Sequence, residues 1–134
     1  MTMNIHEKPL FATPYEWIGG ELAVKALTER FYDLMDLESD YARLREVHGA
    51  TLDNARQKTF LFLCGWLGGP QTYTETYGHP RLRARHMHVP IGIRERDQWL
   101  ACMDQAMGDT RVDETLRARL RESFFKTADF MRNV

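Results

Sequence analysis

The amino-acid sequence predicts an all-α fold, because apolar residues recur at three- and four-residue spacing through most of the chain. No stretch alternates cleanly between apolar and polar residues with turn signals on both sides, as a half-buried strand would. Glycine and proline interrupt the apolar periodicity at several points. We therefore expect the periodic stretches to form separate helices.

Four longer stretches are expected to form the helices that carry the core. Their predicted ranges are 21–36, 52–67, 93–107 and 113–131. In the first of them, Val24, Leu27 and Phe31 fall on one face of a helix. The second is apolar nearly all round in its later half, which implies burial on more than one side. Consecutive helices would then pair, and the two pairs would pack as a four-helix sandwich.

A short helix is expected to open the folded part of the chain. The sequence Thr13-Pro14-Tyr15-Glu16 is typical of a helix N-terminus, with Thr13 as the cap and Glu16 completing a capping box. Gly19-Gly20 ends this helix almost at once. We interpret residues 1–12 as a flexible N-terminal extension and residues 13–134 as a single domain, since no linker or internal repeat appears.

The connections between the longer helices are predicted to differ in kind. A short connecting helix is expected at 40–47, and the stretch 71–79 shows no sustained period and is predicted to be a loop. A very short helix should begin at Pro80 and end before Pro90, because proline favours a helix start and opposes continuation.

Composition and charge argue against several classes of partner. The formal net charge of -1 leaves no excess of positive charge to bind nucleic acid or an anionic membrane surface. No apolar stretch approaches the ~20 residues needed to span a bilayer, and the N-terminus lacks the pattern of a signal peptide. We expect a cytoplasmic protein in which Cys64 and Cys102 are free, buried thiols.

One basic segment stands out among the residues that could carry chemistry. The sequence has no phosphate-binding loop, no dinucleotide-binding glycine motif, no Cys-x-x-Cys and no His-Glu-x-x-His. Residues 81–88, Arg-Leu-Arg-Ala-Arg-His-Met-His, combine imidazoles with cations. A haem requires an apolar slot, a side-chain ligand for its iron and cations for its propionates. On residue chemistry alone, a solvated basic helix with a structural histidine explains this segment better.

The chain resembles the group II truncated haemoglobins in four correctly spaced blocks. The blocks are Phe31-Tyr32, the Gly-Trp-Leu-Gly-Gly-Pro of 65–70, the Gly-His-Pro-Arg-Leu-Arg-Ala-Arg-His of 78–86, and the Glu-Arg-Asp-Gln-Trp-Leu of 95–100. The resemblance runs from Tyr15 to Met131. It implies a truncated globin domain, a two-over-two helical sandwich enclosing a haem b.

The same resemblance implies which residues hold the haem. His86 ends the third block and matches the family's proximal iron ligand. His88, where relatives more often have proline, is its nearest competitor. Arg85 and Lys58 match positions that face the propionates, although ordinary solvated charge explains them equally well. Tyr73 and His79 are expected to touch the propionate edge.

Across the iron, the resemblance places Tyr32 and Trp99, with His48 at the turn before the long second helix. Tyrosine, tryptophan and histidine can all donate hydrogen bonds to bound dioxygen, which carries partial negative charge. Without the resemblance, an aromatic residue on a helical stripe is more simply a core residue.

Two positions on the second long helix depart from what many globins have there. Ala55 occupies the position of a distal histidine and can donate nothing. Thr59 replaces an aliphatic residue. Its hydroxyl either adds a donor to the pocket or bonds back to its own helix, and we favour the second. The apolar walls of the pocket are expected to be Phe31, Phe62 and Leu63.

These residues together predict a haem protein that binds dioxygen and other small diatomic ligands such as nitric oxide and carbon monoxide. Several donors would slow ligand release, which favours redox chemistry over rapid delivery. Oxidation of nitric oxide to nitrate or turnover of peroxide would suit such a site, and both need a reductase that this chain does not contain. A gas sensor or oxygen store without catalysis, and a haem-free interaction domain, are the alternatives. The sequence is compatible with a monomer or a homodimer.

Overall fold

The computed structural model describes residues 11–49 and 51–134, and within these ranges every regular element is a helix. The predicted all-α class is therefore confirmed. The predicted extension lies outside the described residues up to position 10, so its flexibility stays a prediction. Within the described ranges, no helix is long and apolar enough to cross a membrane.

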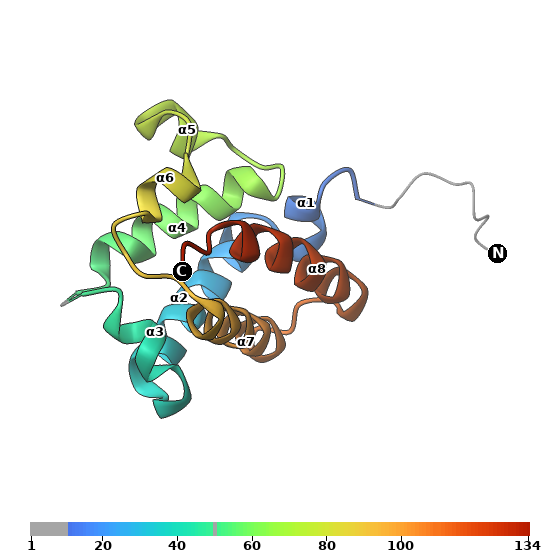
Figure 1. Cartoon of the computed structure of the whole chain (residues 1–134). Coiled ribbons are helices and arrows are strands. Elements are labelled where there is room, and N and C mark those ends of the chain that lie inside the picture. The colour runs from blue at the N-terminus through green and yellow to red at the C-terminus, as the bar shows by residue number, and fades with distance from the viewer. Residues whose placement is uncertain (1–10, 50) are drawn as a thin grey trace.

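Four long helices form the body of the protein. They are α2 (Glu21–Leu37), α4 (Asp53–Trp66), α7 (Ile93–Asp109) and α8 (Glu114–Phe130). Helix α2 packs against α4 and α7, and α7 packs against α8. Figure 1 shows α7 and α8 side by side, with α2 next to α7. These are the predicted pairs, and each predicted range agrees with the structure to within a few residues.

Short helices precede or connect the long ones. They are α1 (Pro14–Ile18), the 3-10 turn η1 (Ser39–Tyr41), α3 (Ala42–Glu46), α5 (Thr72–Tyr77) and α6 (Leu82–His86). The predicted connecting helix at 40–47 corresponds to η1 followed by α3, with a change of helix type at Tyr41.

The prediction of a loop at 71–79 is wrong, because α5 occupies most of it. Six residues are too few to establish a helical period in the sequence. The helix is stabilised by tertiary contact: Tyr73 is buried and its ring meets that of Phe62 on α4 edge to face, with centroids 6.0 Å apart.

Helix α6 begins at Leu82, two residues later than the proline suggested. Arg81 precedes it in the left-handed conformation, with φ of 46°, and cannot belong to the helix. The backbone N–H of Arg81 donates to Nδ1 of His79 at 3.1 Å, which satisfies the amide at this bend. The result is a helix of five residues that ends on His86.

The start of the fold follows its sequence signals. The Thr13 hydroxyl accepts a hydrogen bond from the Glu16 amide, and the Glu16 carboxylate accepts one from the Ala12 amide. Helix α1 then lies against the end of α4, where a Cβ on Gly69 would come within 2.5 Å of the Tyr15 ring. Only glycine therefore fits at position 69 without displacing α1.

The core lies between the long helices and is almost entirely apolar. Its fully buried side chains include Leu27 and Phe31 of α2, Leu63 of α4, Met103 of α7 and Leu116 of α8. Two thiols, Cys64 and Cys102, lie in the same core and are free, as predicted. Burial raises the pKa of Cys102 to about 12, so its thiol keeps its proton and donates to the Phe31 carbonyl.

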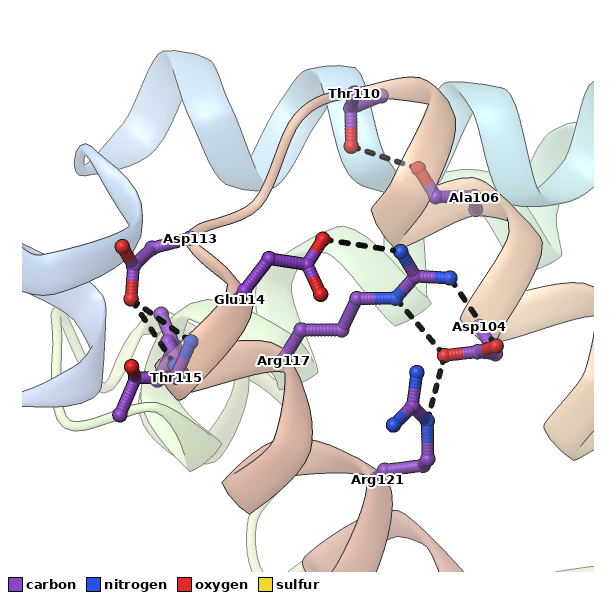
Figure 2. A network of polar contacts seen from close by, with 9 residues as sticks. Asp104, Ala106, Thr110, Asp113, Glu114, Thr115, Arg117 and Arg121 are labelled. Carbon is purple, nitrogen blue, oxygen red and sulfur yellow. Dashed lines mark hydrogen bonds and ion pairs between the residues drawn. The ribbon is translucent and has the colours of Figure 1, made fainter.

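One carboxylate, that of Asp104, links α7 to α8 on the solvent-facing side of the pair. Asp104 of α7 accepts two hydrogen bonds from the Arg117 guanidinium, at 3.0 and 3.2 Å, and a third from Arg121 at 2.9 Å. Figure 2 shows Asp104 between these two arginines of α8, and Asp113 capping the first turn of that helix. Bidentate pairing of this kind sets the register of α8 on α7.

Candidate functional site

The helices line an open cavity of about 590 Å³, to which α2, α4, α6 and α7 all contribute side chains. This volume lies in the range of ~300–1,000 Å³ that is usual for small-molecule and cofactor sites. Most of its wall is apolar. It brings together eight of the predicted site residues: Tyr32, His48, Lys58, Phe62, Tyr73, Arg85, His86 and Trp99.

His86 presents one free ring nitrogen at this cavity. Its Nδ1 lies 2.6 Å from the carbonyl oxygen of Leu82, one turn earlier in α6. A carbonyl can only accept, so Nδ1 carries the proton, and the Nε2 of the neutral ring has a free lone pair. Histidines that bind metals almost always donate their other N–H in this way. The donor chemistry of His86 therefore fits an iron ligand.

Two cations on the cavity wall have no carboxylate partner among the described residues. The ammonium of Lys58 lies 5.0 Å from the centre of the Tyr77 ring, and the guanidinium of Arg85 donates to the Tyr77 carbonyl at 3.5 Å. Arg96, which also lines the cavity, is held by Asp97 and Asp129 at 2.9 and 2.8 Å. Lys58 and Arg85 thus fit the two propionates of a haem better than Arg96 does.

Tyr32 lies in the wall formed by α2, with only 3% of its surface exposed. Its hydroxyl is 2.7 Å from Oγ1 of Thr59 on α4, and either oxygen can be the donor. The expectation that Thr59 bonds back to its own helix is therefore wrong. Burial raises the pKa of Tyr32, while the Thr59 bond and the Arg56 charge lower it less, so the phenol keeps its proton.

His48 is oriented in the same manner as His86. Its Nδ1 lies 2.8 Å from the Leu44 carbonyl, so this nitrogen donates and Nε2 is an acceptor in the neutral ring. Burial lowers the pKa of His48, against the opposing effect of the Leu44 bond, and this favours the neutral ring. His48 thus offers the cavity an acceptor, whereas we expected a donor. Its ring meets that of Tyr32 edge to face, with centroids 6.0 Å apart.

Trp99 of α7 is held between two aromatic neighbours. The centroids of Phe31 and Phe124 each lie 5.4 Å from that of Trp99, in edge-to-face geometry. Within the described residues, the indole N–H has no hydrogen-bond partner, and the side chain lines the cavity. The indole therefore brings an unused donor to the cavity that Tyr32 also lines.

Some of the residues predicted to form the site do not line the cavity. Leu63 is buried in the core and His79 is exposed, so neither lines the cavity. Phe31 is buried behind Tyr32 and Trp99 and supports them. His88 does line the cavity, two residues beyond His86.

The sequence interpretation missed Glu95, which is buried beside the cavity. Its Oε1 accepts a hydrogen bond from the Gly92 amide at 2.9 Å, and its Oε2 lies 3.6 Å from Nε of Arg43. Glutamate three residues after a glycine at a helix start is a capping signal that could have been recognised. This contact caps the N-terminus of α7, the helix that carries Trp99.

Comparison with known proteins agrees with this geometry. Residues 13–133 match the family model of the bacterial-like globins. A group 2 truncated haemoglobin of Bacillus subtilis is 37% identical over 123 residues, which cover 92% of this chain and 90% of the relative. The solved group II 2-on-2 haemoglobin of the plant pathogen Agrobacterium tumefaciens is 43% identical, with a TM-score of 0.89, and the match covers 95% of this chain and 98% of that one.

A helical sandwich around an apolar cavity, with an imidazole of a short helix available to a metal, defines a globin of the two-over-two type. The chain belongs to the bacterial-like globin family, as a group II truncated haemoglobin. Its cofactor is a haem, and its ligands are small gases such as oxygen.

The lowered pKa of His48 should appear in the stability of the protein. A histidine in the unfolded chain titrates near pH ~6.5. Below that pH the unfolded chain binds a proton that the folded chain resists, so the free energy of unfolding falls as pH falls. His48→Gln removes this titration, and we expect a shallower decline in urea unfolding between about pH 7 and about pH 5.

His88→Gln is the matched control, because it removes an exposed histidine that makes no hydrogen bond within the described residues, and it should leave the wild-type decline unchanged. A decline in His48→Gln as steep as that of the wild type would contradict the buried, neutral state of His48.

Proposed function

We propose that the cavity holds a haem b with His86 as the residue that would bind its iron, and that the protein holds dioxygen for redox chemistry. The observation that carries this proposal is the bond from His86 Nδ1 to the Leu82 carbonyl, which leaves Nε2 to face a metal. Lys58 and Arg85, which have no carboxylate partner in the described residues, would pair with the propionates. When bound, the haem supplies the iron that takes up the gas and exchanges electrons.

On the opposite wall, two groups can donate to a bound gas. Thr59 can donate to the phenol oxygen of Tyr32, and the phenol proton is then available to the ligand. The indole of Trp99 is a second donor. Ala55 lines the same wall and adds no polar group. Two charge-assisted bonds, each worth ~1.5–3 kcal/mol, would slow the release of dioxygen by orders of magnitude.

Slow release of dioxygen favours a role in redox chemistry over a role in oxygen delivery. The reaction we propose is oxidation of nitric oxide by dioxygen to nitrate, which consumes an electron and therefore needs an external reductase. Tyr32 and Trp99 would hold the dioxygen in place while nitric oxide enters the apolar part of the cavity. A non-catalytic gas sensor or oxygen store would use the same donors but would not turn over.

One observation favours peroxide as a second substrate. Nε2 of His48 is an acceptor, and dioxygen has no proton to offer it, whereas hydrogen peroxide does. His48 could take the proton of a peroxide O–H, and Tyr32 could donate to the other oxygen. The cavity therefore offers donors and an acceptor together, which suits a ligand with both kinds of group.

The haem assignment is tested by the absorption spectrum. The wild-type chain should bind haem in equal amount and show an intense Soret band in the ferric, ferrous and carbon monoxide forms. His86→Ala should lose stable haem or its normal ligation, because the axial nitrogen is gone. His88→Ala is the control and should keep both. Loss of the spectrum in His88→Ala with retention in His86→Ala would move the ligand to His88.

The role of Tyr32 is tested by the release of dioxygen. Tyr32→Phe should raise the off-rate by roughly tenfold or more, since a charge-assisted bond is lost. Tyr41→Phe is matched to it, because Tyr41 is also buried and hydrogen-bonded, to Gln105, but does not line the cavity. A change in Tyr32→Phe below about threefold would show that Tyr32 is not a principal donor.

The number of turnovers distinguishes a catalyst from a gas sensor or oxygen store. With dioxygen and a reductase present, the protein should consume nitric oxide over many cycles and produce nitrate in equal amount. An electrode for nitric oxide and a nitrate assay measure both. Consumption that stops after a single equivalent would instead support a sensor or store.

A further inference from the structure

Helix α6, which carries His86, has little packing to hold it in place. It has five residues, none of which is buried. It takes part in none of the closely packed helix pairs of the fold. The segment after it, residues 87–92, contains no helix and leads directly into α7. Something other than apolar contact must therefore set the position of His86.

The side chain of Asn133, beyond the end of α8, makes that contact. Its Nδ2 donates to the carbonyl of Val89 at 2.8 Å and to the carbonyl of His86 itself at 3.2 Å. Its Oδ1 accepts a hydrogen bond from the Ile91 amide at 2.9 Å. The backbone amide of Asn133 also donates to the Ile91 carbonyl at 2.9 Å. Backbone groups of His86, the last residue of α6, and of Val89 and Ile91 after it are thus satisfied by one residue that is 47 positions from His86.

A second contact joins the start of α6 to the same C-terminal stretch. Nη1 of Arg83 donates to the carbonyls of Phe130 and Arg132, at 3.1 and 2.8 Å. Phe130 is the last residue of α8 and Arg132 lies just beyond it, so neither carbonyl has a helical partner of its own. Figure 1 shows the C-terminus beside the loop that follows α6, in agreement with these bonds.

We propose that Asn133 is a positioning residue for the iron ligand, acting with Arg83 to hold α6 against the end of α8. The inference rests on the proposed role of His86. The His86 backbone is held by Asn133 and its ring by the Leu82 carbonyl, so the ring has one orientation at the cavity. Asn133 itself lines no part of the cavity and is not a catalytic residue.

Only a side-chain amide can make all three of the side-chain hydrogen bonds that Asn133 makes. The side chain must donate twice and accept once, which asparagine does and aspartate does not. In Asn133→Asp a carboxylate oxygen would face the carbonyls of His86 and Val89 with no proton between them. The shape of the side chain is nearly unchanged, so the variant removes the bonds without opening a cavity.

The chain provides a matched control in Gln71. Its Nε2 donates to the carbonyls of Gly65 and Gly69, at 3.0 and 3.2 Å, after the end of α4. Gln71→Glu therefore removes two comparable bonds from an amide to backbone at a helix end. Gln71 does not line the cavity and lies on another segment from His86.

The test measures haem retention and the iron–histidine bond in the two variants and the wild type. Loss of a group that orients a metal ligand typically costs 10–100-fold in affinity. We expect Asn133→Asp to release haem about tenfold faster to an apoprotein acceptor, and to shift the iron–histidine stretching frequency of the ferrous form. Gln71→Glu should change neither. Wild-type values in Asn133→Asp would overturn the proposal.

A measurement on the wild type covers the case in which Asn133→Asp fails to fold. The Ile91 amide, which donates to Asn133, should exchange slowly with deuterium, and rapid exchange would overturn the proposal. A wild-type chain that shows no Soret band would overturn the proposed function as well. A normal Soret band together with unchanged haem release in Asn133→Asp would overturn this inference alone.

Discussion

The hydrogen bond between Nδ1 of His86 and the Leu82 carbonyl is the interaction on which the site depends. It fixes the tautomer of the ring, because a carbonyl can only accept, and it leaves the other nitrogen for a metal. A helix of five residues is the shortest that contains both ends of this one-turn bond, and the bend at Arg81 comes directly before it. The cost of so short a helix is that packing cannot hold it, and contacts from distant parts of the chain must do so.

Across the cavity, His48 makes the same kind of hydrogen bond as His86, but with a different consequence for a bound ligand. His48 also commits Nδ1 to a carbonyl, but it stands among Tyr32, Thr59 and Trp99. There its free nitrogen is an acceptor beside two donors. A pocket with this mixture distinguishes ligands by whether they carry a proton, and dioxygen and peroxide differ in that respect. From residue types alone, Tyr32, Trp99 and His48 would all have been interpreted as hydrogen-bond donors.

The fold predicted from the sequence agrees with the structure wherever a helix is long enough to display its period. Helices α2, α4, α7 and α8 each present several turns of apolar residues, and their pairing follows from chain order. The prediction failed at α5, which is stabilised by the contact between Tyr73 and Phe62. Most candidate site residues were found through the resemblance, since their chemistry alone favoured plain core or surface roles. Leu63 and His79 do not line the cavity, because Leu63 is buried in the core and His79 is exposed, where it accepts a hydrogen bond from the Arg81 amide.

The sequence by itself determined the helical class, the long helices and a short basic helix between Pro80 and Pro90 that contains His86. Local spacing, caps and helix-breaking residues carry that information, and each acts within a few residues of its own position. Only the tertiary structure decided that Thr59 meets Tyr32, that His48 is an acceptor and that Asn133 holds the segment after α6. The bonds of Thr59 and Asn133 join residues far apart in the chain, and which nitrogen His48 presents depends on the rotation of its ring. The physical reason is that a hydrogen bond needs its atoms placed to within a few tenths of an ångström. Apolar periodicity requires only that the apolar residues lie on the buried face of the helix.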